Sequence, residues 1–360
     1  FDKLVEELHP ERSSHRNPLL QVLVNGVHSL DRTVALPGLA VTEEPLGDPV
    51  VRFPLTLYVR EHPDGIRLSL IYQRSLFSPE RMAALMDHVK NDVKKADYLA
   101  RRERIIKAIN ANAWDGGWYT RCYDDSGSAI GSKDNPFAKI FMEPQCWGLI
   151  AGVADDERAR QLLASCDELL ATEVGYLLLT PSFKEFDPNI GRISSMEPGI
   201  CENGTIYAHL NIWMILGLLR YGMGDKAYDI FRRITPGYVD GEASLKQKCP
   251  PFQYSNCYFG PEHRNNKFQQ EFTWITGSVA WFNIVPVTEM LGAKADFDGL
   301  VIDPCLPSQW NECEVERSYR GATYHISIKN PNGLQKGAVT LTLDGKPVDG
   351  NKLPLPQSGG

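Results

Sequence analysis

The chain has 360 residues, of which 42% are hydrophobic and 23% are charged, and its formal net charge is −7. This length allows two or three domains, and the acidic balance argues against a nucleic-acid or anionic-membrane partner. No apolar run approaches the roughly 20 residues that cross a bilayer. The chain begins with Phe1-Asp2-Lys3-Leu4, without a start methionine or a signal segment, which is typical of the middle of a longer sequence.

The cysteines are dispersed and none has the spacing of a metal-binding pair. No Cys-x-x-Cys motif occurs and no histidine clusters with the cysteines, so we expect no zinc site. Dispersed cysteines in a chain of this length are typical of reduced thiols. We therefore predict a cytoplasmic protein with free thiols at Cys122, Cys146, Cys166, Cys201, Cys249, Cys257, Cys305 and Cys313.

The first ninety residues have strand character. Apolar runs at 20–24, 50–60 and 66–72 predict three strands, and Pro63-Asp64-Gly65 predicts a turn between the last two. Ser78-Pro79-Glu80 then supplies an N-cap with proline at the first helical position, which predicts a helix up to about residue 89.

From residue 90 to about 295 the pattern is helical. Residues 90–110 predict a charged amphipathic helix whose apolar face carries Tyr98, Leu99, Ile105, Ile106 and Ile109. Further helices are predicted at 156–172, 206–221, 226–234 and 276–291. Successive helices joined by loops rich in glycine and proline indicate an α/α rather than an α/β architecture.

After residue 297 the pattern returns to strands, at 299–302, 313–317, 322–328 and 338–343, with a hairpin turn at Asp344-Gly345. This predicts a small antiparallel β module over 297–352, and residues 353–360 are expected to form a frayed tail.

Four features of the helical region combine residue types that carry chemistry: the segment Ala113–Tyr119 with two tryptophans, the segment Pro198–Gly204, His209, and the segment Thr273–Ser278. Each also has a packing interpretation. The tryptophans can close a core, Asn-Gly can form a turn, a lone histidine on a helix is often hydrogen-bonded in a core, and Thr-Gly-Ser can be an N-cap. Together, aromatic rings, a carboxylate and a Thr-Gly-Ser turn suit a site for a sugar and phosphate.

Residues 107–350 resemble the inverting phosphorylases of glycoside hydrolase family 94, which act on cellobiose, chitobiose and cellobionic acid. Segment 114–121 resembles the family's Trp-Asp-Gly-x-Trp-Tyr-x-Arg motif. The other segments that carry the resemblance follow in the family's order, at 140–145, 202–209, 234–236, 274–278 and 298–304.

This resemblance implies a multi-domain chain, with a partial (α/α)6 barrel over 91–296 followed by the small antiparallel β module. It implies that phosphate cleaves a β-linked disaccharide reversibly into an α-sugar 1-phosphate and a free sugar, with no organic cofactor or metal and with inorganic phosphate as co-substrate. A homodimer is also common in the family. The implied phosphate-binding residues are His209, Thr276, Gly277, Ser278 and Gln269, with Gln270 as the alternative to Gln269. The implied substrate-binding residues are Glu202, Trp114, Trp118 and Arg121.

Two departures from the family pattern bear on activity. Thr205 stands where the family usually has a second glycine after Glu-Asn-Gly, which leaves the disaccharide open. The family's general acid is an aspartate in an Asp-Trp-Asn segment upstream of the Trp-Asp-Gly motif, and this chain has no such segment. Asp115 belongs to a different motif, where we expect it to cap a helix or to position Gly116 and Gly117. No catalytic residue is therefore assigned, and the alternative is an inactive truncated or chimeric chain that at most binds sugar or phosphate.

Residues 1–90 resemble instead the C-terminal part of a condensation domain of nonribosomal peptide synthetases, an α/β fragment. Residues 17–22 are similar to that family's Asn-Pro-Leu-Phe-Gln-Val strand, and residues 53–57 are similar to its Phe-Asp-Leu-Thr-Leu segment. The family's His-His-x-x-x-Asp-Gly motif is absent, so we expect no acyl-transfer site, although an acyl-transfer fragment stays a further alternative. We place the junction between the two parts at residues 88–95.

Overall fold

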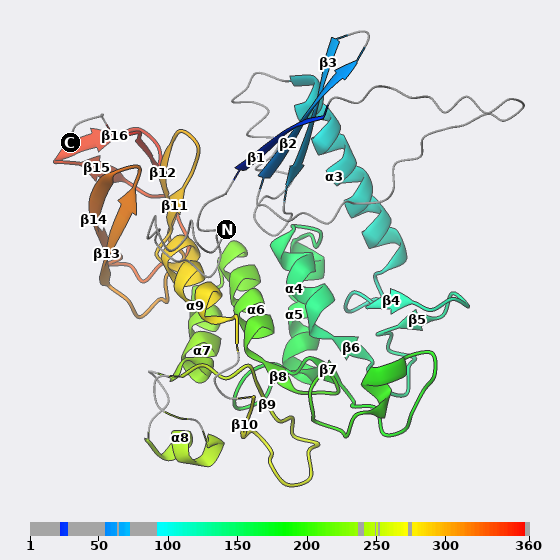
Figure 1. Cartoon of the computed structure of the whole chain (residues 1–360). Helices are drawn as coiled ribbons and strands as arrows, with labels where there is room; N and C mark the ends of the chain where they lie inside the picture. Colours follow the sequence, from blue (N-terminus) through cyan, green and yellow to red (C-terminus); the bar gives the residue numbers. More distant parts are fainter. Residues whose placement is uncertain are drawn as a thin grey trace, which may run out of the picture. The chain divides into compact units, whose positions relative to one another are not determined.

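The computed structural model describes residues 22–27, 55–62, 65–72, 92–236, 241–248, 250, 253–272 and 276–356. The chain divides into two compact units, Phe1–Arg104 and Ile105–Gly360. Figure 1 labels the helices and strands of both. The division lies inside a helix and not at residues 88–95, so the predicted domain boundary at residue 90 stays a prediction.

The first unit contains a three-stranded sheet in the order β1-β2-β3. Its strands are β1 (Val22–Val27), β2 (Leu55–His62) and β3 (Gly65–Tyr72). Strand β1 runs parallel to β2, and β2 pairs with β3 as a hairpin in which His62 faces Gly65. All three predicted strands are confirmed, while the helix predicted after Ser78 lies outside the described residues.

Helix α3 (Asp92–Asn112) confirms the helix predicted at 90–110. Ile106 and Ile109 pack against the large core of the second unit. Leu99 and Ile105 are 41% and 56% exposed, so the apolar face is narrower than predicted.

The second unit is built around the apolar helix α6. Its helices are α4 (Met142–Ile150), α5 (Asp156–Leu169), α6 (Ala208–Arg220), α7 (Gly224–Ile234), α8 (Gly241–Gln247) and α9 (Val279–Val285). In Figure 1, α4, α5, α7 and α9 run beside α6 or beside each other. Helices α4, α7 and α9 each pack against α6. A Cβ on Gly217 would lie 2.9 Å from the Leu149 side chain, so this glycine allows α4 and α6 to approach closely.

The sequence did not predict α4 and α8, and it placed the start of another helix too early. The helix predicted at 276–291 begins only at Val279, and from Pro286 to Met290 it continues as a π-helix, η3. Pro286 has no N–H to donate to the preceding turn, which explains the change of helix type. The described residues of this unit form a layer of packed helices, and the partial (α/α)6 barrel stays a prediction.

Short strands lie at the ends of the helices. They are β4 (Cys122–Tyr123), β5 (Ala129–Ile130), β6 (Ile140–Phe141), β7 (Leu179–Thr180), β8 (Ile206–Tyr207), β9 (Cys257–Tyr258) and β10 (Gln270–Glu271). Strand β6 leads directly into α4, and β8 leads directly into α6. Strands β10, β9 and β8 form one antiparallel sheet, which joins segments that are far apart in the sequence.

The β module has a small core of its own, which includes Leu300, Ile302, Tyr319 and Leu353. One sheet contains β11 (Ala293–Ala295), β12 (Gly299–Ile302) and β17 (Lys352–Pro354), and two hairpins pair β13 (Glu312–Tyr319) with β14 (Ala322–Lys329) and β15 (Leu341–Leu343) with β16 (Lys346–Val348).

Two details of the module refine the predictions. Asp344 and Gly345 have φ of 49° and 77°, which confirms the predicted hairpin turn. The prediction that the tail begins at Leu353 is wrong, because Leu353 is 3% exposed and pairs with Leu300 in the sheet. Burial of its apolar side chain holds the strand to Pro354 in place.

Candidate functional site

The Trp-Asp-Gly segment forms a compact loop whose aromatic rings pack. Trp114 lies edge-on to Tyr119, with ring centroids 5.0 Å apart. The Trp118 indole N–H donates to the carbonyl oxygens of Gly131 and Lys139, at 2.9 and 3.0 Å. Both tryptophans contact the large core. These contacts favour the packing interpretation of the segment, and a role of Trp114 and Trp118 in sugar binding stays a prediction.

Asp115 connects this segment to the loop that follows it. Its Oδ2 accepts hydrogen bonds from the Ser132 hydroxyl at 3.0 Å and from the Lys133 backbone N–H at 2.7 Å. The carboxylate therefore holds two loops together and does not cap a helix. This structural role agrees with leaving Asp115 out of the catalytic assignment.

Arg121 lies beside a buried carboxyl group that the sequence did not single out. Its guanidinium is 3.6 Å from Oε1 of Glu143, in the first turn of α4. The second oxygen of Glu143 is buried without a hydrogen-bond partner. Burial raises the pKa of Glu143, and the positive charge of Arg121 opposes that rise. Sequence alone gives little signal here, because only folding brings residues 121 and 143 together.

Residues 199–205, which we name the Glu202 loop, are held by a dense network. Asn203 is fully buried; its side-chain oxygen accepts from the Phe183 N–H at 2.7 Å, and its amide donates to the carbonyls of Phe183 and Met196, each at 2.9 Å. Gly204 has φ of 94°. A Cβ there would lie 2.2 Å from the Ser182 hydroxyl, so glycine is required.

Thr205, which departs from the family pattern, completes the loop. Its side chain is fully buried, and its hydroxyl donates to the Cys201 carbonyl at 2.5 Å. Thr205 does not adopt the left-handed conformation of Gly204, so the backbone needs no second glycine here. The threonine therefore closes the turn that presents Glu202, whose Oε2 is buried without a hydrogen-bond partner.

His209 lies in the first turn of α6, directly after β8. Its ring lies 4.9 Å from the Tyr207 ring and 5.2 Å from the Trp213 ring. Burial lowers the pKa of His209 from its usual 6.5. A neutral imidazole at neutral pH retains one N–H donor, which can bind an anion without the cost of burying a cation.

Trp213 joins three helices on the His209 side of α6. Its ring centroid lies 5.2 Å from that of Trp147 on α4 and 6.2 Å from that of Trp281 on α9. Trp281 comes one turn after Ser278. The first turns of α6 and α9 are therefore linked through a single ring, which brings His209 toward the segment that begins α9.

Residues 276–278, which we name the Thr276 turn, contain two hydrogen bonds between their own residues. The Thr276 hydroxyl accepts from the Ser278 N–H at 3.1 Å and donates to the Ser278 hydroxyl at 2.7 Å. Ser278 is 2% exposed, whereas Gly277 is exposed and a Cβ there would meet nothing within 4 Å. Residues 273–275, which include Trp274, lie outside the described residues.

The sheet β10-β9-β8 joins strands that lie close in the chain to several candidate residues. Strand β8 leads to His209, and β10 contains Gln270 and Glu271, a few residues before the Thr276 turn. Gln269 lies just before β10 and is partly buried, while Gln270 is 9% exposed. Glu271 contacts the Glu202 loop, since its Oε2 accepts from the Cys201 N–H at 3.2 Å. The phosphate-binding role of Gln269, or of Gln270 in its place, stays a prediction.

Comparison with known families identifies the family of the chain. The family described as the glycosyl hydrolase 94 superfamily, catalytic domain, matches residues 70–292. The chain belongs to this family. The match covers α4 to α9 and every candidate residue, and it ends at the start of the β module.

Among curated relatives in the glycosyl hydrolase 94 family, a solabiose phosphorylase of Paenibacillus borealis is 37% identical over 252 residues, 70% of this chain and 33% of the relative. An N,N'-diacetylchitobiose phosphorylase of Vibrio proteolyticus is 32% identical over 262 residues, 72% of this chain and 32% of the relative. The chain thus spans about a third of the length of the curated relatives that it matches.

A second kind of relative matches a short part of the chain. A probable nonribosomal peptide synthetase of Salinispora arenicola is 39% identical over 83 residues, which are 21% of this chain and 1% of that protein. The resemblance to peptide synthetases is therefore supported over a short segment. That this segment comes from a condensation domain stays a prediction.

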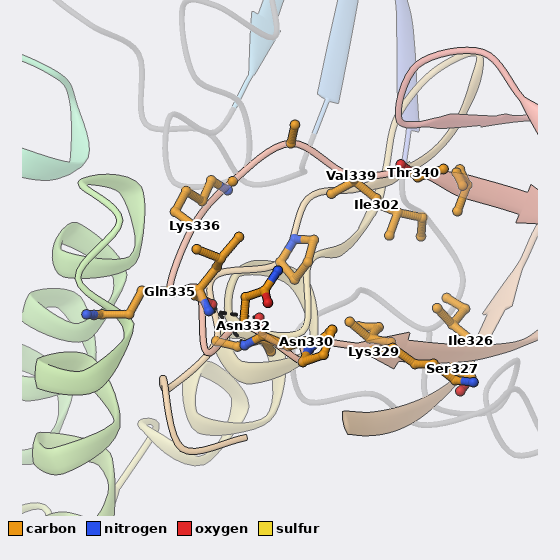
Figure 2. A pocket seen from close by; sticks show the side chains of 18 residues that line it. Ile302, Ile326, Ser327, Lys329, Asn330, Asn332, Gln335, Lys336, Val339 and Thr340 are labelled. Atoms are coloured by element: carbon orange, nitrogen blue, oxygen red, sulfur yellow. Dashed lines mark hydrogen bonds between the residues drawn. The ribbon is translucent and has the colours of Figure 1, made fainter. Parts of the chain in front are cut away.

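A cavity of about 330 Å³ lies in the β module, between β12, β14 and the loop of residues 330–340 (Figure 2). Its polar side chains already hold that loop in place. Lys336 pairs with Asp303 at 2.6 Å, and the Gln335 side-chain oxygen accepts from the Asp225 N–H at 2.9 Å. None of the candidate phosphate or sugar residues lines this cavity.

The described part of the chain contains no cluster of histidine, cysteine, aspartate or glutamate that could hold a metal ion. None of its helices is long and apolar enough to cross a membrane. The prediction of free thiols is confirmed for the seven described cysteines, namely Cys122, Cys146, Cys166, Cys201, Cys257, Cys305 and Cys313.

Proposed function

We propose that this chain carries the phosphate-binding and sugar-contacting residues of an inverting disaccharide phosphorylase. In the proposed reaction a phosphate oxygen attacks the anomeric carbon of a β-linked disaccharide. The glycosidic C–O bond breaks, and the products are an α-sugar 1-phosphate and a free sugar. Membership of the glycosyl hydrolase 94 family and the phosphorylase names of the relatives support this class of reaction.

The proposed roles of the residues follow from the chemistry of phosphate as the nucleophile. An inverting glycosidase needs one carboxyl group as acid and a second as base for water. Phosphate is already an anionic nucleophile, so a second carboxylate would repel it, and neutral donors suit that side better. We assign phosphate to His209, Gln269 and the Thr276 turn (Thr276, Gly277 and Ser278), and the sugar to Glu202, with Trp114, Trp118 and Arg121 as further contacts.

The observation that carries the proposal is the sheet β10-β9-β8. It joins the strand before His209 to the strand before the Thr276 turn, and Glu271 of the same sheet binds the Glu202 loop. This connection between the Glu202 loop and the strand before His209 supports the proposal that both belong to one site.

Turnover also requires a carboxylic acid that protonates the leaving sugar, and no residue of this chain is assigned to that step. This specific gap supports a second candidate function, the binding of phosphate and sugar without turnover. The preferred disaccharide, a homodimer, a cytoplasmic location and an acyl-transfer role of the first unit are further proposals that rest on resemblance alone.

The test is the release of sugar 1-phosphate from a panel of β-linked disaccharides in the presence of phosphate. Phosphorolysis that is lost in His209→Ala and in Glu202→Gln but kept in Glu289→Gln, a partly buried glutamate paired with Lys294, would support the first candidate. If no turnover is seen, calorimetric titration with inorganic phosphate and with cellobiose separates binding without turnover from the absence of binding. Binding of both supports the second candidate, and binding of neither refutes both.

A further inference from the structure

Glu271 is a buried carboxylate that no assigned role uses. It is 7% exposed and lies on β10. Its Oε2 accepts from the Cys201 backbone N–H at 3.2 Å and from the Cys257 thiol at 3.3 Å, and its Oε1 accepts from the Cys201 thiol at 3.4 Å. Burying a carboxylate costs free energy unless hydrogen bonds replace the water that it loses. These three donors offset that cost.

The two thiols are suited to this role because they stay protonated. Burial, together with the nearby negative charge of Glu271, raises the pKa of Cys201 to about 12. The same two causes raise the pKa of Cys257. A protonated thiol donates a weak hydrogen bond, whereas the backbone N–H of Cys201 donates a strong one to a carboxylate. The bond to the backbone N–H is therefore the main anchor.

The anchored residue is the immediate neighbour of Glu202. Cys201 has φ of 47°, a left-handed conformation that costs free energy in a residue with a side chain. Its N–H is held by Glu271 and its carbonyl by the Thr205 hydroxyl at 2.5 Å. Anchors on both sides of the Cys201 peptide units fix the direction in which the next side chain leaves the backbone.

Glu271 also connects this loop to the helix that carries His209. On β10 it faces Cys257 of β9, and Cys257 faces Tyr207 of β8, the residue directly before α6. The chain from Cys201 through Glu271 and Cys257 to Tyr207 consists of hydrogen bonds and strand pairing alone.

We propose that Glu271 is a positioning residue, which holds Glu202 in the orientation that binds the sugar and keeps it in register with His209. This inference rests on the proposed function. It predicts that a loss of Glu271 weakens sugar binding while phosphate binding, which depends on His209 and the Thr276 turn, changes little.

The experiment compares Glu271→Ala and Glu271→Gln with the matched control Glu289→Gln in the full chain. Calorimetric titrations measure the affinity for cellobiose and for inorganic phosphate separately. We expect Glu271→Ala to weaken cellobiose binding about tenfold and phosphate binding less than about twofold. Glu271→Gln recovers part of the loss because its amide oxygen can still accept the Cys201 N–H, and Glu289→Gln leaves both affinities unchanged.

Amide hydrogen exchange adds a readout that needs no ligand. If Glu271 anchors the Cys201 N–H, exchange at Cys201 is faster in Glu271→Ala and partly slowed again in Glu271→Gln. This result supports the positioning role of Glu271 even if the wild type binds no sugar. In that case the proposed function fails, and the positioning role does not. Unchanged exchange at Cys201, or equal loss of sugar and phosphate affinity in Glu271→Ala with an intact fold, overturns the inference. Cys201→Ala keeps the backbone donor and is expected to change sugar affinity less than Glu271→Ala.

Discussion

The Glu202 loop and the Thr276 turn are the two candidate binding segments, and they are supported in different ways. The Glu202 loop is held by partners from residues 183, 196 and 271, which lie up to 70 positions away. The side-chain hydrogen bonds that the structure describes in the Thr276 turn connect its own residues, Thr276 and Ser278. We therefore expect the Glu202 loop, with its distant partners, to be the more rigid of the two segments.

This difference indicates that the proposed sugar segment depends on distant parts of the fold, and that the proposed phosphate segment depends more on its own residue types. A substitution in the Glu202 loop should therefore reduce stability first. A substitution in the Thr276 turn should reduce phosphate affinity with little effect on stability.

The largest effect is expected for Asn203→Ala, which removes three side-chain hydrogen bonds from a fully buried site. We expect the free energy of unfolding to fall by ~2–4 kcal/mol, because the Phe183 and Met196 backbone groups lose their partners. Urea unfolding measures this loss. Asn189→Ala, at an exposed position, serves as the control and should change stability by less than about 0.5 kcal/mol. Equal effects of the two substitutions would contradict the rigid loop.

A smaller loss is expected for Thr205→Val, which keeps the side-chain volume but removes the hydroxyl donor to the Cys201 carbonyl. The free energy of unfolding should fall by ~1–2 kcal/mol. Thr205→Ser keeps the hydroxyl and should cost less in the same urea experiment. If serine proved as damaging as valine, packing of the methyl group and not the hydrogen bond would hold the loop.

On the phosphate side, Thr276→Val should lower phosphate affinity about fivefold while changing the free energy of unfolding by less than about 1 kcal/mol. The reason is that, among the described residues, the hydroxyl bonds to Ser278 of the same turn. Titration calorimetry with phosphate and urea unfolding measure the two quantities. Thr288→Val, which removes a hydroxyl bonded to the Ile284 carbonyl, is the matched control and should leave phosphate affinity unchanged. A stability loss as large as that of Asn203→Ala would remove the contrast between the segments.

The smallest effect concerns pH. The folded-state pKa of His209 lies below its usual 6.5, so the unfolded chain takes up a proton first as the pH falls. The wild type should therefore lose stability relative to His209→Gln from about pH 6.5 down to the folded-state pKa, while the difference between the two proteins stays constant at higher pH. Unfolding free energies of both proteins between pH 5 and 8 measure this. A wild type that gained stability on acidification relative to the variant would show that His209 is held as a cation.

Several elements could be predicted because their signals are local. Apolar runs predicted β1, β2 and β3, and a helical period predicted α5, α6 and α7. Asp344-Gly345 predicted a hairpin turn, which depends only on backbone conformation. Helix α4 was missed because it is short and carries Pro144 and Gly148, which weaken any helical signal. Leu353 was taken for a tail residue because only its pairing with Leu300 makes it part of a sheet.

The sequence by itself determined the family, the order of the motifs and the residue types at the two candidate segments, because motifs are local in the chain. Only the tertiary structure decided how those residues are supported. Glu271 lies 70 positions from Cys201 and has no motif of its own, yet it anchors the Glu202 loop. Trp118, which stands in a prominent motif, donates its indole N–H to two backbone carbonyls. Contacts between distant segments depend on how helices and strands pack, and no local pattern of residues records that packing.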